Sequence, residues 1–306
     1  MVAVYGQILN FPEANLSNLD TILLLGISNS KFLGKSGYDK ILLTIFEDIK
    51  QTNENGAYKI KFEFCAGDTP ALQSMGGFVM GVGNAQNPCR ECLTHKNEIL
   101  DIDVEEKCRM RNRDNCEQIA RELNDGQTVA GISRFTHLYD YEFFDPVTMT
   151  PQDPMHILLE GIARRIIMDF FKLWVQTKKS SLAEINLRIK NFKLHHIHKN
   201  DQLKICLKES DLYKNEFIIS ASQMRTLLEV FPFMFHDICD TNSPDYKLIN
   251  ILRKFSMIMF DFRPSIARIT ELKILIKAFI IEYKSCFTKA FPKLHYLVHM
   301  PKWITK

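Results

Sequence analysis

Hydrophobic positions along the first 68 residues predict an α/β arrangement. Apolar residues dominate 1–9, which predicts a strand, and then recur at helical spacing over 19–27 and again over 38–49. Residues 58–64 alternate between apolar and polar side chains, which predicts a half-buried strand that leads to Asp68. Strand, two helices and strand together indicate an α/β core over residues 1–68.

The rest of the chain has a different pattern. Residues 69–152 lack long periodicity and predict an irregular insertion, whereas residues 153–306 are almost entirely helical in period. Within that last region the apolar spacing predicts five long helices, over residues 155–175, 182–192, 222–235, 246–262 and 266–287. We therefore expect three regions, 1–68, 69–152 and 153–306, in a fold that is α/β at its start and mostly α-helical afterwards.

Charge is divided unevenly along the 306 residues. The totals, 39 basic and 36 acidic residues with 46% hydrophobic residues, are those of an ordinary globular protein and exclude a disordered or collagen-like chain. Residues 1–160 carry 14 basic and 23 acidic side chains, a net charge of −9, and residues 161–306 carry 25 and 13, a net charge of +12. The basic part favours an acidic partner such as nucleic acid, although a lysine-rich solvated surface gives the same composition.

No secretory signal or other targeting signal is visible, and the longest apolar stretches are too short to span a membrane. We therefore expect an intracellular, reducing environment and no membrane partner. In that setting the eight cysteines are thiols or metal ligands rather than a disulfide framework.

Two pairs of residues have the spacing of zinc ligands. Cys89 and Cys92 form a CxxC motif, whose two thiolates can reach one zinc ion and leave two tetrahedral positions open. His295 and His299 lie four residues apart on one face of a helix that Pro301 is expected to end. The four would complete a Cys2His2 site, but a redox CxxC and a histidine pair on an ordinary polar surface are the alternatives.

Two acidic positions also deserve a chemical interpretation. Asp68 follows a predicted strand, a common position for active-site residues in α/β folds, but it can equally cap the next turn. Asp153 begins a helix in which His156 and Glu160 share a face, where they can hold a metal or hydrogen-bond to each other.

The basic region offers spaced cations for phosphate contacts. Lysines and histidines are dense between Lys190 and Lys199, where His195, His196 and His198 also occur. The paired cations that we take as DNA-contact candidates are Arg164, Arg165, Lys178, Lys179, Arg253 and Lys254. No zinc finger, basic zipper or other named DNA-reading motif accompanies them.

Taken in order, the motifs resemble a known family. The series is Gly67-Asp68-Thr-Pro-Ala71, Gly76-Gly-Phe78, Cys89-Arg-Glu-Cys92, Pro151-Gln-Asp-Pro-Met-His-Ile-Leu-Leu-Glu-Gly161, Ser220-Ala-Ser-Gln-Met224 and His295-Tyr-Leu-Val-His299-Met-Pro301. It is similar to transposon-derived transposases of the CACTA, Mirage and Chapaev group, which are related to the recombination-activating recombinase of vertebrate immunity. The resemblance implies an incomplete ribonuclease-H-like core with a large helical insertion, and zinc at the CxxC and the histidine pair.

The same resemblance implies a lost activity. Members cut and join DNA with three carboxylates, Asp, Asp and Glu, that hold two Mg²⁺ or Mn²⁺ ions. Asp68 matches the second Asp, and the other two have no match, since the first belongs before Met1 and the Glu after Lys306. Glu160 stands in the wrong place in the series to replace the Glu. We expect a chain truncated at both ends that neither nicks nor joins DNA.

These observations favour a transposase-derived protein that is catalytically inactive and retains DNA binding. The resemblance further implies a homodimer and a nuclear location. A zinc-stabilised helical interaction scaffold and a remnant without function are the alternatives.

Overall fold

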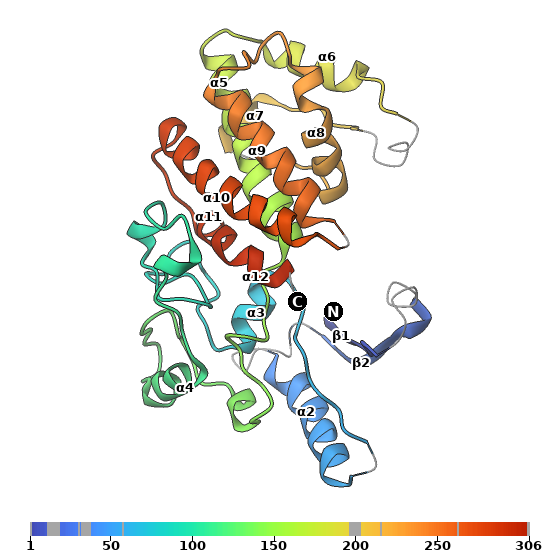
Figure 1. Ribbon diagram of the computed structural model, residues 1–306, viewed down its shortest axis with the longest axis vertical. Coiled ribbons are helices and arrows are strands. Elements are labelled where there is room, and N and C mark those ends of the chain that lie inside the picture. The colour runs from blue at the N-terminus through green and yellow to red at the C-terminus, as the bar shows by residue number, and fades with distance from the viewer. Residues whose placement is uncertain are drawn as a thin grey trace. The chain divides into compact units, whose positions relative to one another are not determined.

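The computed structural model describes residues 2–10, 19–29, 31, 38–56, 58–195, 203–214, 216–261 and 263–304 (Figure 1). The described residues are mostly helical and include one two-stranded sheet, which confirms the coarse expectation of α/β elements with a largely helical remainder. The chain divides into two compact units. The first comprises Met1–Leu93 and Met110–Pro151, and the second comprises Thr94–Arg109 and Gln152–Lys306.

The sheet of the first unit is an antiparallel pair. Strand β1 (Val2–Gln7) pairs along its whole length with β2 (Ile22–Ser28), with the first residue of β1 opposite the last residue of β2. The predicted first strand is confirmed, but the helix predicted over 19–27 is wrong. A short run of consecutive apolar residues suits a strand as well as a helix, and here it pairs with the backbone of β1.

The helices of the first unit follow the sheet. Helix α2 (Asp39–Glu54) confirms the helix predicted from residue 38, while α3 (Thr69–Met75) and α4 (Arg113–Glu122) lie in the region expected to be irregular. Residues 58–64 belong to no strand within the described part of the chain, so the second predicted strand is wrong. Alternation indicates which side chains are apolar, but a strand also needs a partner for its backbone.

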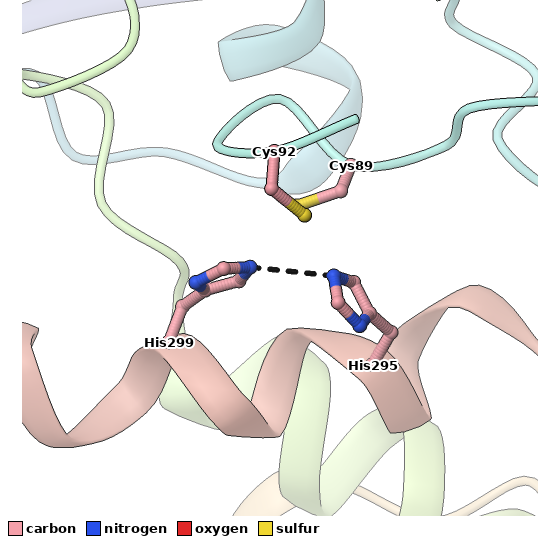
Figure 2. A group of neighbouring side chains, drawn as sticks. All are labelled: Cys89, Cys92, His295 and His299. Carbon is pink, nitrogen blue, oxygen red and sulfur yellow. Dashed lines mark hydrogen bonds between the residues drawn. The ribbon is translucent and has the colours of Figure 1, made fainter. Parts of the chain in front are cut away.

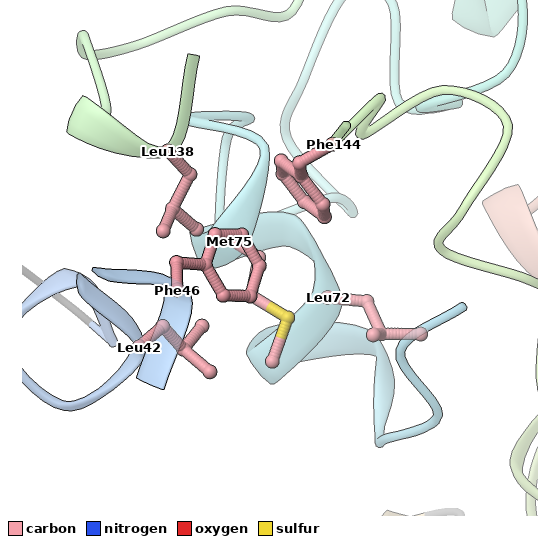
Figure 3. Close-up of a cluster of buried hydrophobic side chains, with 6 residues drawn as sticks. All are labelled: Leu42, Phe46, Leu72, Met75, Leu138 and Phe144. Carbon is pink, nitrogen blue, oxygen red and sulfur yellow. The ribbon is translucent and has the colours of Figure 1, made fainter. Parts of the chain in front are cut away.

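One hydrophobic core connects α2 with α3 (Figure 3). It is built from six buried side chains, two of α2, two of α3, one of the 3₁₀ turn η6 (His137–Asp140) and one that follows η6: Leu42, Phe46, Leu72, Met75, Leu138 and Phe144. From α3, Gln73 donates a hydrogen bond of 3.1 Å to the carbonyl oxygen of Pro88. This core therefore supports the segment that carries the CxxC motif.

The second unit is helical throughout its described regular structure. Its elements are η4 (Lys96–Glu98), η5 (Glu105–Lys107), η7 (Met155–Ala163), α5 (Arg164–Gln176), α6 (Leu182–Asn191), α7 (Glu209–Lys214), α8 (Ala221–Met234), α9 (Pro244–Met259), α10 (Ile266–Cys286), α11 (Pro292–Tyr296), η9 (Leu297–His299) and α12 (Met300–Ile304). All five predicted long helices are confirmed, although the first begins as a π-helix, η7, before it continues as α5. Among the described residues, no helix has the length and apolar character needed to cross a membrane.

Helix α9 packs against α8 and α10 (Figure 1). The π-helix η7 contacts both α8 and α9. The aromatic side chains of Phe171, Trp174, Phe231 and Phe235 pack against one another in the interior, mostly in tilted or edge-on contacts, with neighbouring ring centroids 4.7 to 6.0 Å apart. Trp174 is fully buried and donates its indole N–H to Asp245 at 3.0 Å. The apolar face of η7 and α5 is thus central to this unit.

The histidine pair lies near the end of the described chain. Helix α11 continues through η9 into α12, so the prediction that Pro301 ends the helix is wrong. Pro301 is the second residue of α12. In the first turn of a helix, proline removes no hydrogen bond that the helix would otherwise make.

Candidate metal centre

The CxxC motif forms a buried turn in the first unit. Cys89 is 1% exposed and Cys92 is fully buried. The backbone N–H of Glu91 points at the Cys89 sulfur at 3.4 Å. Cys92 also forms an isolated antiparallel β-bridge with Met110. This bridge connects the CxxC turn to the segment around Met110.

Two buried guanidinium groups brace this turn. Arg111 donates from Nε to the carbonyl oxygens of Cys89 and Cys92, at 3.0 and 3.1 Å, and its own N–H bonds to the Glu91 carbonyl at 2.9 Å. Arg90 lies between the cysteines and donates to the carbonyl oxygen of Thr150 at 2.8 Å. The carbonyl groups of Cys89 and Cys92 are therefore held by the guanidinium of Arg111.

The histidine pair lies on the helical path through α11 and η9 in the second unit. His295 and His299 are both fully buried, and their Nε2 atoms are 3.3 Å apart. On the other side of its ring, His299 places Nδ1 2.8 Å from Oε1 of Glu105. The i, i+4 spacing thus brings both imidazoles to one face, as the sequence predicts.

The two cysteines and the two histidines belong to one group of potential metal ligands (Figure 2). One donor atom of each residue lies within 4.8 Å of the chosen donor atom of every other, and all four residues are buried. The group can therefore hold a metal ion. In Figure 2 a dashed line marks the contact between the imidazole nitrogens of His295 and His299. The sulfur atoms of Cys89 and Cys92 are drawn beside this contact.

The donor set fits zinc. Two thiolates and two imidazoles are a common tetrahedral set for structural zinc, whereas Mg²⁺ and Ca²⁺ prefer oxygen. In a tetrahedron with Zn–N bonds of about 2.0 to 2.1 Å, two nitrogens lie about 3.3 Å apart. The observed separation of the two Nε2 atoms is 3.3 Å.

Glu105 adds charge beside the histidines. Its carboxylate also contacts Lys302, whose Nζ lies 3.1 Å from Oε1. Burial raises the pKa of Glu105, but the hydrogen bonds from His299 and Lys302 and the charge of Lys302 outweigh that effect, so its pKa is lowered overall. Glu105 is therefore an ionised acceptor at neutral pH.

Asp153, His156 and Glu160 form a chain of contacts along η7. Asp153 accepts the N–H of Met155 at 2.7 Å, and its other oxygen lies 2.7 Å from His156 Nδ1, while His156 Nε2 is 3.6 Å from Glu160. The imidazole thus uses its two nitrogens on two different carboxylates. Lys293 completes the cluster by donating from Nζ to the carbonyl oxygen of His156 at 2.7 Å, and burial lowers the pKa of this lysine.

Asp68 caps a helix. Its side chain is exposed and accepts the backbone N–H of Ala71 at 2.8 Å, as the N-cap of α3. This is the capping role that the sequence allowed for it. Among the described residues, the groups of three or more potential metal ligands that the structure brings together do not include Asp68.

The DNA-contact candidates differ in their surroundings. Arg164 donates to the carbonyl of Ile219 at 2.7 Å, and Arg165 lies over the ring of Phe291, so both guanidinium groups have internal partners. Arg253 is half-buried. Exposed candidates are Lys178, Lys179 and Lys254. In the histidine-rich segment, His195 is exposed, and His196 and His198 lie outside the described residues.

Three residues with a role at these sites were not found from the sequence. Glu105 and Arg111 contact ligand residues, and Lys293 contacts His156. Each contact joins segments at least nineteen residues apart, and for Glu105 and His299 the separation is 194 residues. The spacing of residues within one segment cannot predict a contact between segments that are far apart in the sequence.

No protein-family profile, no curated protein and no solved structure matches this chain. The site geometry and the order of the motifs are therefore the grounds for any functional assignment.

Proposed function

We propose that Cys89, Cys92, His295 and His299 bind one zinc ion in a structural role. The observation that carries this proposal is the buried group of two sulfur and two nitrogen donors. Four protein ligands fill a tetrahedral zinc completely and leave no position for a substrate, which is the difference between structural and catalytic sites. Such a zinc would link two segments that are far apart in the sequence, and its binding energy would add to the stability of the fold.

Metal analysis tests the zinc site. We expect one zinc per purified chain, and we expect the zinc to be lost when Cys89→Ser and Cys92→Ser are combined. Because binding energy contributes to folding, a chelator should also lower the melting temperature, and added zinc should restore it.

A second pair of cysteines provides the matched control. Cys206 is exposed and Cys286 is partly exposed, and neither belongs to the group of ligands. The combined Cys206→Ser and Cys286→Ser variant should keep its zinc and its melting temperature. Equal zinc contents in the two double variants would contradict the proposal.

We further propose that the chain derives from a transposase and binds duplex DNA without cleaving it. Support comes from the ordered series of motifs and from the net charge of +12 over residues 161–306. Lys178, Lys179 and Lys254 are the exposed cations among the candidates and suit phosphate contacts best. A zinc-stabilised scaffold without a nucleic-acid role is the alternative.

The absence of cleavage follows from the carboxylates. Two-metal phosphoryl transfer needs several carboxylates that converge on the same pair of ions. Asp68 is the one residue that matches the family's catalytic set, and its side chain accepts a helix N–H. Glu160 lies next to His156 on η7 and does not match the family's Glu.

Gel-shift and nicking assays test both parts of this proposal. Duplex DNA should be retarded at 50 mM salt, and the affinity should fall by about 10-fold or more at 200 mM salt as phosphate contacts are screened. The same DNA should stay intact with Mn²⁺. Cleavage that disappears with Asp68→Ala would show the chain to be active, and the absence of any salt-dependent shift would favour the scaffold.

Charge-neutralised variants locate the contacts. Replacing Lys178, Lys179 and Lys254 with glutamine should weaken binding and reduce its salt dependence. The control neutralises three exposed lysines from the acidic part of the chain, Lys40, Lys50 and Lys59. Equal losses in the two triple variants would mean that the basic region is not the binding surface.

A further inference from the structure

We propose that Glu105 is a positioning residue for the metal centre, because it holds His299 in the tautomer that presents Nε2 to the metal. This inference rests on the zinc site proposed above. It concerns contacts within the second unit, where η5 carries Glu105 and η9 carries His299.

The hydrogen bond determines which nitrogen carries the proton. A neutral imidazole has one N–H and one lone pair, and an ionised carboxylate can only accept. With Glu105 Oε1 2.8 Å from Nδ1 of His299, the proton lies on Nδ1 and the lone pair lies on Nε2. The imidazole is therefore prepared as a ligand through its Nε2 atom.

The Nε2 atom of His299 points toward the Nε2 atom of His295. Nε2 of His299 lies 3.3 Å from Nε2 of His295, the separation expected for two nitrogens on one tetrahedral zinc. Both rings are fully buried, so solvent cannot reorient them freely. A ring flip of His299 would break its bond to Glu105 and turn Nε2 away from this point.

Lys302 holds the carboxylate in turn. Its Nζ contacts the same oxygen of Glu105 at 3.1 Å, from the first turn of α12, three residues beyond His299. The Glu105 side chain is 29% exposed and the imidazole is fully buried, which distinguishes the contact from an ion pair on the surface. Metal-bound histidines commonly donate their other N–H to a carboxylate, and losing that partner weakens metal binding about 10- to 100-fold.

Competition titration with a zinc indicator tests the effect on affinity. In the full chain, Glu105→Gln should weaken zinc binding about 10- to 100-fold while the saturated protein still holds one zinc. Glu106 is the matched control because it is the next residue of η5 and is exposed. Glu106→Gln removes the same charge from the same turn and should leave the affinity unchanged.

Nitrogen-15 NMR of the histidine rings tests the tautomer directly. His299, assigned by the signal that disappears in His299→Gln, should carry its proton on Nδ1 in the native chain. With zinc removed from both proteins, this preference should be lost in Glu105→Gln, because a glutamine amide can donate to Nδ1 as well as accept from it. A role in packing alone would leave the tautomer unchanged.

The outcomes separate this inference from the metal site itself. A native chain that binds no zinc would contradict the site, whereas zinc binding that is equally tight in Glu105→Gln and Glu106→Gln would overturn the role of Glu105 alone. If Glu105→Gln does not fold, Glu105→Asp keeps the charge and withdraws the carboxylate by one methylene. It should weaken zinc binding in the same direction, and unchanged affinity would again overturn the inference.

Discussion

Asp39 begins α2 with its carboxylate almost completely buried. It accepts hydrogen bonds from both terminal nitrogens of Arg134, at 3.0 and 3.1 Å, and from the hydroxyl of Thr136 at 3.0 Å. Arg134 also donates to the carbonyl oxygen of Ser74 in α3. The carboxylate of Asp39 thus pairs with the guanidinium of Arg134, which contacts both α2 and α3.

Removing that carboxylate charge should be costly. Breaking a buried ion pair leaves the other charge without compensation, which destabilises a protein by about 3–5 kcal/mol. Because Arg134 is 23% exposed, solvent compensates part of its charge, and we expect Asp39→Asn to reduce the free energy of unfolding by about 2–3 kcal/mol, at or below the lower end of that range. Urea denaturation monitored by circular dichroism measures the change.

An exposed aspartate on the same helix is the control. Asp48 faces solvent on α2, so Asp48→Asn should change the free energy of unfolding by less than about 0.5 kcal/mol. Similar losses for the two substitutions would show that the effect comes from the net charge of α2 rather than from the pair with Arg134.

The π-helix η7 packs closely against α11, the helix that bears His295. A β-carbon added to Gly161 would lie 2.3 Å from Cδ of Lys293 and 3.0 Å from the carbonyl oxygen of His156. The lysine side chain crosses η7 at this glycine and donates to that same carbonyl. Because Lys293 is in α11, the glycine allows α11 to pack closely on η7.

Gly161→Ala should therefore destabilise the protein. The methyl group must displace the lysine from its hydrogen bond, and overpacking of this kind costs about 1–3 kcal/mol. In a Lys293→Ala background the clash with the lysine is absent and the close approach to the His156 carbonyl oxygen remains, so the same change should cost less than it does in the native chain. A double-mutant cycle from urea denaturation measures the coupling.

Equal costs in the two backgrounds would contradict this account of Gly161. The cycle also bears on the metal site, since displacing Lys293 should shift α11 and with it the two histidines. The motif around residues 153–161 then acts by positioning the helix of the histidine pair, through packing rather than through ligands of its own.

The second compact unit contains the basic region of the chain and, in addition, one acidic segment. The second unit contains the basic residues beyond 161 and also the segment Thr94–Arg109, which carries three basic and five acidic side chains. Two of these acids pair with lysines of the helical region, Asp101 with Lys284 at 3.0 Å and Glu105 with Lys302 at 3.1 Å. Part of the positive charge is thus compensated within the unit, and the remaining exposed lysines are those on which DNA binding would depend.

Local pattern was sufficient for the long helices and for the choice of the candidate metal ligands. The five long helices follow from apolar residues repeated at the period of an α-helix, because each helix makes its backbone hydrogen bonds within itself. The four candidate ligands follow from residue type, since thiolates and imidazoles are donors that zinc prefers, and from the spacing within each pair. The union of the two pairs was a hypothesis until the structure brought their donor atoms together.

Tertiary structure decided everything that depends on a distant partner. A strand needs the backbone of another strand, so the apolar pattern alone predicts a helix where β2 forms and a strand over residues 58–64, where the structure has none. The bond between Glu105 and His299 and that between Asp39 and Arg134 join residues 194 and 95 positions apart. The energy of such contacts depends on distance in space, which the order of residues does not contain, and the fold alone brings these side chains within bonding distance.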